Sequence, residues 1–178
     1  MQAVVFTGGP GAGKTTVLHA LRAQGYAVVE DTARAIIQSR NRQGLAPRPQ
    51  PLEFAQEILR TDIEQYRLSA GVSGYVFFDR GVLDALCLVD QVAPLAQAEL
   101  DAFVAKYPYH RQVFCFPPWD AIYARDAERD HTFAHAVQVH ETTVQWYRRC
   151  KYEVVEMPKL SVSERCAFVL QELARAVV

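Results

Sequence analysis

The chain has 178 residues, a formal net charge of −1 and a hydrophobic fraction of 50%. This length fits one compact domain, which we place at residues 1–178, and the charge provides no positive field for nucleic acid or an anionic membrane. The apolar N-terminal stretch is too short for a signal peptide or a membrane span. The four cysteines lie far apart and match no metal-ligand spacing, so we predict a cytoplasmic protein with reduced, mostly buried thiols.

Short apolar runs alternate with helix-patterned segments along the chain. Strands are predicted at residues 3–7, 26–29, 75–78, 111–116 and 152–156. Helices are predicted at 14–24, 32–43, around 54–66, in parts of 82–106, and at 133–150 and 161–178. The proline-rich segment 46–51 is predicted as a loop. Continuous apolar strands that alternate with helices indicate a parallel sheet covered on both faces, with ligands beyond the carboxyl ends of its strands.

Directly after the first predicted strand, residues 8–15 match the phosphate-loop pattern G-x-x-x-x-G-K-[ST]. Glycines let the backbone curl so that N–H groups point at phosphate oxygens, and the following helix adds its positive N-terminal end. Lys14 supplies a charge for the β- and γ-phosphates, and Thr15 offers a hydroxyl to Mg²⁺. The predicted nucleotide-binding residues are Gly8, Gly9, Pro10, Gly11, Ala12, Gly13, Lys14, Thr15 and Thr16.

The third predicted strand ends in Asp79 and Arg80. An aspartate at this position suits the magnesium role of a Walker B carboxylate, and Arg80 is a candidate for binding a phosphoryl group. The structural alternative is that Asp79 caps the helix from about residue 82 and that Arg80 is a surface residue.

Glu30, Asp31 and Arg34 follow the second predicted strand. A carboxylate there faces an acceptor hydroxyl and can take its proton, so we predict Asp31 as the base and Glu30 and Arg34 as substrate-binding residues. The alternative is that Asp31 is only the N-cap of the next helix and that Arg34 is a solvated side chain.

Arg125 and Arg129 follow the fourth predicted strand, four residues apart, and therefore share a face if the segment is helical. We predict that they are catalytic arginines on a lid at about 117–133 that closes over the transferring phosphoryl group. The alternative is a charged surface face that pairs with Asp126 and Glu128.

In this order, the motifs resemble the P-loop kinases of the nucleoside and nucleotide kinase group. They are most similar to the ribosylnicotinamide kinase-like branch, whose members are also described as AAA-type predicted ATPases. The resemblance rests on the phosphate loop, on residues 31–34 and 78–81, on Tyr-x-x-Asp-x-x-Arg at 123–129 and on Tyr-Glu-Val-Val at 152–155. It implies an α/β fold with a parallel five-stranded sheet in the order 2-3-1-4-5 and an arginine-bearing lid.

The resemblance implies a small-molecule kinase that transfers the γ-phosphoryl of Mg-ATP to a hydroxyl or phosphate of a nucleoside-like or other small metabolite. The alternatives are an ATPase and a nucleotide-binding regulator without useful turnover. A motor ATPase normally carries a glutamate after the Walker B aspartate, whereas position 80 is arginine. The expected ligands are ATP, Mg²⁺ and a small acceptor, without nucleic-acid or membrane partners, and a homo-oligomer is compatible with the sequence.

Overall fold

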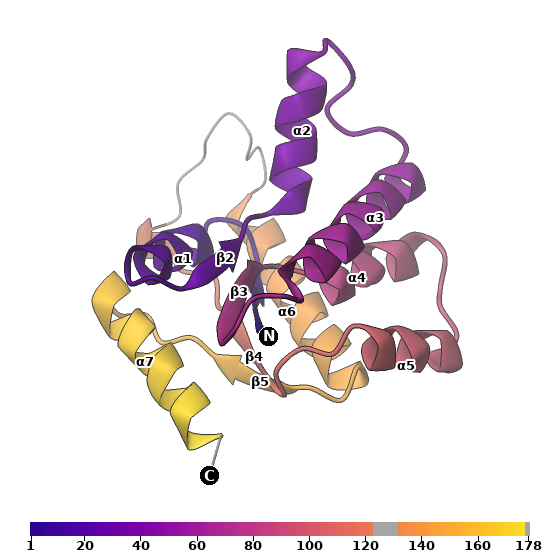
Figure 1. Cartoon of the computed structure of the whole chain (residues 1–178). Coiled ribbons are helices and arrows are strands. Elements are labelled where there is room, and N and C mark those ends of the chain that lie inside the picture. Colours follow the sequence, from indigo (N-terminus) through magenta and orange to yellow (C-terminus); the bar gives the residue numbers. More distant parts are fainter. Residues whose placement is uncertain (123–131, 177–178) are drawn as a thin grey trace.

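The computed structural model describes residues 1–122 and 132–176. At its centre is a parallel sheet of five strands in the order β2-β3-β1-β4-β5 (Figure 1). The strands are β1 (Gln2–Gly8), β2 (Ala27–Val29), β3 (Tyr75–Asp79), β4 (Gln112–Phe116) and β5 (Glu153–Glu156). The predicted fold class and strand order are confirmed, and each strand end lies within one residue of the predicted position.

The central strand β1 is apolar on both faces. It pairs with β3, where Val5 lies opposite Phe78, and with β4, where Phe6 lies opposite Phe114. Successive side chains of a strand point to opposite faces. Val5 therefore belongs to the core cluster on one face of the sheet and Phe6 to the cluster on the other, and the exposed fraction of both is 0%.

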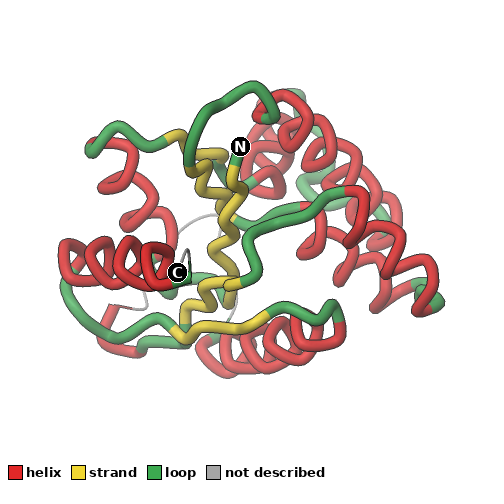
Figure 2. Tube along the Cα trace, turned by 60° about the horizontal axis from the view of Figure 1, so that its bottom comes forward, coloured by secondary structure: helices red, strands yellow, loops and turns green. Residues whose placement is uncertain are grey.

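Helices cover both faces of the sheet, and Figure 2 shows the strands running between them. One core cluster contains residues of α1 (Lys14–Ala23) and α7 (Val162–Arg175), which also contact each other. The other cluster contains residues of α3 (Pro51–Ser69), α4 (Val82–Val92), α5 (Gln97–Lys106) and α6 (Phe133–Arg149). This arrangement places the end of β1, and the loop that follows it, between the two helical layers.

The helix α2 (Thr32–Arg42) projects away from the sheet, beyond the carboxyl end of β2 (Figure 1). It is anchored by Ile36, which packs with Ile58 of α3 and Ala85 of α4. The sequence prediction was wrong at one end of the following loop, because α3 begins at Pro51. Proline fits the first helical position, where no intrahelical N–H donor is needed.

The four cysteines are buried, and their thiols are free. Within residues 1–122 and 132–176, we find no helix that combines the length and apolarity needed to cross a membrane. After β4 the chain forms the short 3-10 helix η1 (Asp120–Ile122) beside the phosphate loop.

Candidate nucleotide site

The phosphate loop joins β1 to α1, and several of its glycines have backbone angles that side chains disfavour. Gly8, Gly11 and Gly13 have φ angles of 115°, 74° and 82°. Glycine adopts such angles without the steric cost of a Cβ atom. The helix α1 begins at Lys14, directly after the loop, so its free N–H groups lie at the same place.

Close packing is a second reason for glycine at the start of the loop. A Cβ atom on Gly9 would lie 2.6 Å from the carbonyl oxygen of Ala136 in α6. A Cβ atom on Gly8 would overlap the carbonyl oxygen of Phe116 in β4. These glycines were predicted to bring the backbone to phosphate oxygens, and in the structure they also let α6 and β4 approach the loop.

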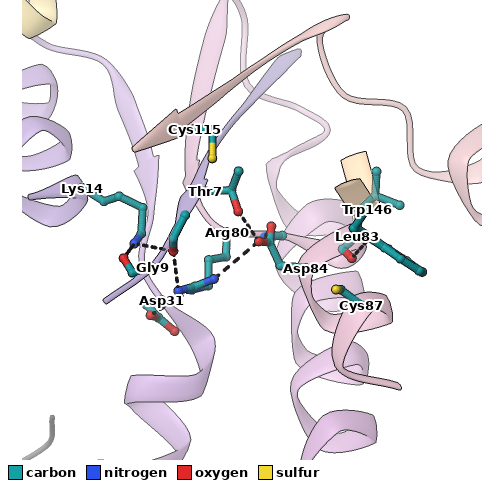
Figure 3. Close-up of polar contacts among 12 residues, drawn as sticks. Thr7, Gly9, Lys14, Asp31, Arg80, Leu83, Asp84, Cys87, Cys115 and Trp146 are labelled. Atoms are coloured by element: carbon teal, nitrogen blue, oxygen red, sulfur yellow. Dashed lines mark hydrogen bonds and ion pairs between the residues drawn. The ribbon is translucent and has the colours of Figure 1, made fainter. Parts of the chain in front are cut away.

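Lys14 is buried at the centre of the loop, with 7% of its surface exposed. Its ammonium group donates to the carbonyl oxygens of Gly8 and Gly9, at 3.0 and 2.8 Å (Figure 3). Burial and the neighbouring Arg80 guanidinium lower the pKa of Lys14 to about 8. No carboxylate of the described residues lies within ion-pair distance of this ammonium group, so a bound anion would compensate its charge.

Thr15 and Asp79 lie together, as predicted for a magnesium site. The Thr15 hydroxyl donates to Oδ2 of Asp79 at 3.0 Å. The other carboxylate oxygen, Oδ1, is buried and has no hydrogen-bond partner among the described residues. An unpartnered carboxylate oxygen beside a hydroxyl fits Mg²⁺, which prefers oxygen ligands. Asp79 does not cap α4, because that helix begins after Gly81 and its capping side chain is Asp84.

Arg80 connects the phosphate loop to two carboxylates. Its guanidinium donates to the Gly8 carbonyl at 2.8 Å, and it lies 3.8 Å from Oδ2 of Asp31 and 3.5 Å from Oδ1 of Asp84. Burial acts to lower the pKa of Arg80, but Asp84, Asp31 and Asp79 outweigh it and raise that pKa. Its φ of 68° is unusual for a residue other than glycine. Arg80 is therefore held inside the site and is not the surface residue of the alternative interpretation.

Asp31 caps α2 and also faces Arg80, so the cap of the alternative interpretation is present, while its role as the base stays a prediction. Its Oδ1 accepts a hydrogen bond from the Arg34 amide at 3.2 Å and so caps α2, while its Oδ2 faces Arg80. Glu30 instead forms an exposed ion pair with Arg22 at 2.7 Å. The side chain of Arg34 is half-buried and lines the same cavity as Asp31.

Asp84 was not predicted, although it organises the site. It accepts a hydrogen bond from the Thr7 hydroxyl and faces Arg80 (Figure 3). It also accepts from the Tyr147 hydroxyl at 2.6 Å and from the Gly81 amide at 3.1 Å. These bonds fix the carboxylate that orients Arg80. Arg80 lies four residues before Asp84, but it precedes the first residue of α4, so helical spacing in the sequence does not signal this pair.

A cavity of about 1100 Å³ extends from the phosphate loop into the space between α2, α3 and α4. On this side its lining includes Asp31, Arg80, Phe54, Ile58 and Asp62. The Asp62 carboxyl is hydrogen-bonded to Thr32, and burial raises its pKa to about 7. Asp62 was not predicted as a site residue, because it lies within the apolar pattern of a helix.

The predicted catalytic arginines Arg125 and Arg129 lie outside the described residues. Their role on a lid at about 117–133 stays a prediction.

A phosphate loop between the first strand and helix, an aspartate at the end of the adjacent strand and the strand order 2-3-1-4-5 together define a P-loop protein with a kinase-like fold. The model of the family described as "AAA domain" matches residues 3–165, and the chain belongs to that family. No curated protein matches the sequence.

Solved structures of deoxyadenosine kinase from M. mycoides have a similar fold. The structure with the products dCMP and a flexible dCDP bound aligns with a TM-score of 0.67 at 13% identity, and the alignment covers 98% of this chain and 100% of that chain. The structure with dATP bound aligns with a TM-score of 0.67 at 12% identity, and the structure with dCTP bound aligns with a TM-score of 0.63 at 12% identity. The coverage of both chains is the same in all three alignments. At such identities, the likeness establishes a shared fold.

Proposed function

We propose that the protein is a magnesium-dependent kinase that transfers the γ-phosphoryl group of ATP to a hydroxyl or phosphate of a nucleoside-like metabolite. The observation that carries this proposal is the continuity of the cavity from the phosphate loop to Asp31 and Arg80 and into the space between α2, α3 and α4. A hydrolase needs room for a water molecule beside the phosphate loop. The cavity, about 1100 Å³ in all, extends beyond the phosphate loop to Phe54, Ile58 and Asp62, and this extension supports a second substrate beside the nucleotide.

The polar groups of this cavity are arranged for transfer. Asp31 takes the proton of the acceptor hydroxyl as its oxygen bonds to the γ-phosphorus and the bond to the bridging oxygen of the leaving ADP breaks. Arg80 lies between Asp31 and the phosphate loop, where its charge stabilises the transferring group. Lys14 exchanges its loop carbonyl partners for the β- and γ-phosphate oxygens.

Thr15 and Asp79 would hold the magnesium ion, through the Thr15 hydroxyl and the Asp79 carboxylate. When bound there, the ion would supply positive charge that stabilises the phosphate groups. An arginine follows Asp79 in this chain, and its partners Asp31 and Asp84 hold it toward the cavity. A motor ATPase carries its water-orienting glutamate at this position. In this chain the same position carries the positive charge of Arg80.

The test is consumption of ATP with Mg²⁺ in the presence and absence of a panel of acceptors. The panel includes deoxynucleosides, nucleosides, nucleoside monophosphates and ribosylnicotinamide, the last because of the resemblance at residues 31–34 and 78–81. We expect at least one member to be phosphorylated and to raise ADP production well above the rate without acceptor. The Lys14→Ala variant should lose at least about 100-fold of this turnover while it remains folded, because the Lys14 charge binds ligand.

Two results would contradict the proposal. Rapid ATP hydrolysis that no acceptor changes would indicate an ATPase. Tight ATP binding without turnover, with or without the whole panel, would indicate a nucleotide-binding regulator.

A further inference from the structure

Positive charge is concentrated in α2 and in the loop that follows it. Residues 32–52 contain four arginines and no aspartate, glutamate or lysine. Since the whole chain carries a net charge of −1, the other residues together carry −5. The net charge alone predicted no nucleic-acid partner, because it conceals this asymmetry. A local concentration of one sign of charge is typical of a surface that binds a partner of the opposite sign.

One face of α2 carries two of these arginines and two side-chain amides. The four residues are spaced as i, i+4, i+7 and i+8, which places them along one side of the helix: Arg34, Gln38, Asn41 and Arg42. Ile36, which anchors α2 to the core, lies on another side. Figure 1 shows α2 projecting from the rest of the molecule, and the last three residues of the face are exposed. The face therefore offers guanidinium and amide groups, which proteins use to bind nucleic acid.

The carboxylates near α2 already have partners of their own. Glu57 lies 3.4 Å from the guanidinium of Arg40, which is not part of the face. The exposed carboxylate of Glu30 forms its ion pair with an arginine of α1. Arg42 of the face and Arg48 of the following loop are exposed, and within the described part of the chain neither pairs with a carboxylate. The structure thus leaves the charges of Arg42 and Arg48 uncompensated, so an anionic partner would interact favourably with both.

The face begins at the cavity of the proposed acceptor and continues beyond it. Arg34 and Arg48 line the cavity, whereas Arg42 lies two turns further along α2, outside the lining. Eight residues separate Arg34 from Arg42, which corresponds to about 12 Å along the helix. A stacked strand carries one phosphate about every 3.4 Å, so this length matches about three nucleotides. The single phosphate of a free nucleoside monophosphate does not reach from one of these arginines to the other.

We infer that the phosphoryl acceptor is the 5′-hydroxyl end of a single-stranded oligonucleotide, whose phosphodiester backbone lies along this face of α2. The terminal nucleoside enters the cavity, and Arg34, Arg42 and Arg48 bind the phosphates on its 3′ side. The 5′-hydroxyl oxygen bonds to the γ-phosphorus of ATP, its proton passes to Asp31, and ADP leaves with the bridging oxygen. The inference rests on the proposed function and names its acceptor.

The neighbours of these arginines favour a nucleic-acid strand over an acidic polypeptide. The amides of Gln38 and Asn41 are suited to sugars and base edges, which lie beside the phosphates of a strand. A strand also carries one negative charge on every nucleotide, at a spacing that the length of the face accommodates. The strand is single at its end, because the terminal nucleoside enters the cavity without a complementary base.

The transfer test uses ATP labelled at the γ-phosphate and compares free nucleosides with a single-stranded octanucleotide, prepared as DNA and as RNA with a 5′-hydroxyl end. We expect at least one octanucleotide to be phosphorylated with a kcat/KM at least tenfold above that of any nucleoside. A nucleoside that reacts as well as both octanucleotides, or better, would overturn the inference and leave the proposed function intact. If neither kind of acceptor is labelled, the proposed function is refuted together with the inference.

The variant Arg42→Gln tests the face itself, because it removes one charge outside the cavity. We expect it to weaken binding of a dye-labelled 5′-hydroxyl octanucleotide at least fivefold at low salt, measured by fluorescence anisotropy. The slope of log Kd against log salt concentration should fall by about 0.7, the value for one phosphate contact of a single strand. Arg148→Gln is the matched control, because Arg148 is exposed, lies in the last turn of α6 as Arg42 does in α2, and pairs with no carboxylate of the described residues. Equal effects of the two substitutions would overturn the inference, because net charge alone would then explain binding.

A further measurement uses the wild-type protein and does not depend on the folding of a variant. Octanucleotide binding should weaken as the salt concentration rises, with a slope of about two in log Kd against log salt concentration for three phosphate contacts. Poly-glutamate, an acidic polypeptide, should compete at least tenfold more weakly than unlabelled octanucleotide at equal concentration of charge. Equal competition would assign the face to an acidic protein, and a slope near zero would show that no phosphate is bound there. Either result would overturn the inference.

Discussion

Lys14, Asp31 and Asp62 show how burial and hydrogen bonding set the chemistry of single side chains in this site. Lys14 is a buried cation with two carbonyl partners, Asp31 is an N-cap that also faces Arg80, and Asp62 is a buried acid. Each arrangement leads to a measurable consequence.

The lowered pKa of Lys14 predicts that nucleotide affinity falls at alkaline pH. Below about pH 8, the free protein already carries the Lys14 proton, whereas above it binding of the anionic nucleotide must take up a proton. The Kd for Mg-ATP should therefore rise above pH 8, by at most about tenfold per pH unit. Calorimetry in two buffers of different ionisation enthalpy should show proton uptake at pH 9. The Lys14→Arg variant, whose guanidinium does not titrate, should show no such slope; the same slope in both proteins would contradict the assignment.

Substitution of Asp31 separates its two roles. Asp31→Asn keeps an oxygen that caps α2, so the free energy of unfolding should change by less than about 1 kcal/mol. Phosphoryl transfer to a verified acceptor hydroxyl should nevertheless fall by about 100-fold or more, because an amide cannot take the proton. Asp31→Ala should show the same kinetic loss and should also lose about 1 kcal/mol of stability. If Asp31→Asn leaves transfer intact, Asp31 is a cap only and Glu30 becomes the candidate base.

The raised pKa of Asp62 predicts that the free energy of unfolding depends on pH. Its pKa is about 7 in the folded protein and near the ordinary 3.8 when unfolded, so the folded state binds the proton more tightly. This contribution to stability is complete below the unfolded pKa and is lost as the pH rises through 7. Asp62→Asn removes the effect. One pKa unit corresponds to about 1.4 kcal/mol. The free energy of unfolding of Asp62→Asn relative to wild type, measured in urea, should therefore rise by about 2–3 kcal/mol between pH 5 and pH 8. An equal difference at both pH values would mean that Asp62 is ionised throughout.

At the scale of the elements, the phosphate loop is held between α6 and β4. A Cβ atom on Gly9 would meet the Ala136 carbonyl of α6. We therefore expect Gly9→Ala to displace that helix and to destabilise the protein by about 1–3 kcal/mol, the usual cost of overpacking. Gly71→Ala is the matched control, because a Cβ atom there has nothing within 4 Å and should change stability by less than about 0.5 kcal/mol. Equal effects of the two substitutions in urea unfolding would contradict tight packing between the loop and α6.

At the scale of the molecule, ligand binding should stabilise the whole fold, because the site joins both helical layers to the sheet. At a concentration of 100 times Kd, Mg-ATP adds about 2.7 kcal/mol, which corresponds to a rise of roughly 5–10 °C in Tm for a chain of this size. Removal of magnesium with EDTA should reduce the rise, because the ion that Thr15 and Asp79 would hold is then absent. The Lys14→Ala variant should show little rise. An unchanged rise in EDTA would show that the ion does not contribute to nucleotide binding.

The phosphate loop and the order of strands and helices could be predicted from the sequence, because both depend on residues that are close together in the chain. The curl of residues 8–15 requires glycines and one lysine at fixed spacing, and a strand between two helical layers requires a continuous apolar run. Asp31 and Asp79 could be proposed for the same reason, since each directly follows a strand whose end must lie at the ligand edge of the sheet.

The partners of these residues were decided only by the tertiary structure. Asp84 meets Thr7 and Tyr147 across separations of 77 and 63 residues, and Arg165 reaches Ala12 across 153. No local pattern marks such pairs, because the sequence around a buried aspartate or arginine of a helix does not differ from that around an exposed one. Only packing against neighbouring segments buries the side chain. Burial also determines the shifted pKa values of Lys14 and Asp62. The sequence thus determined where the phosphate loop lies, and packing between distant segments decided which charges surround it, because desolvation and long-range contacts exist only in the folded chain.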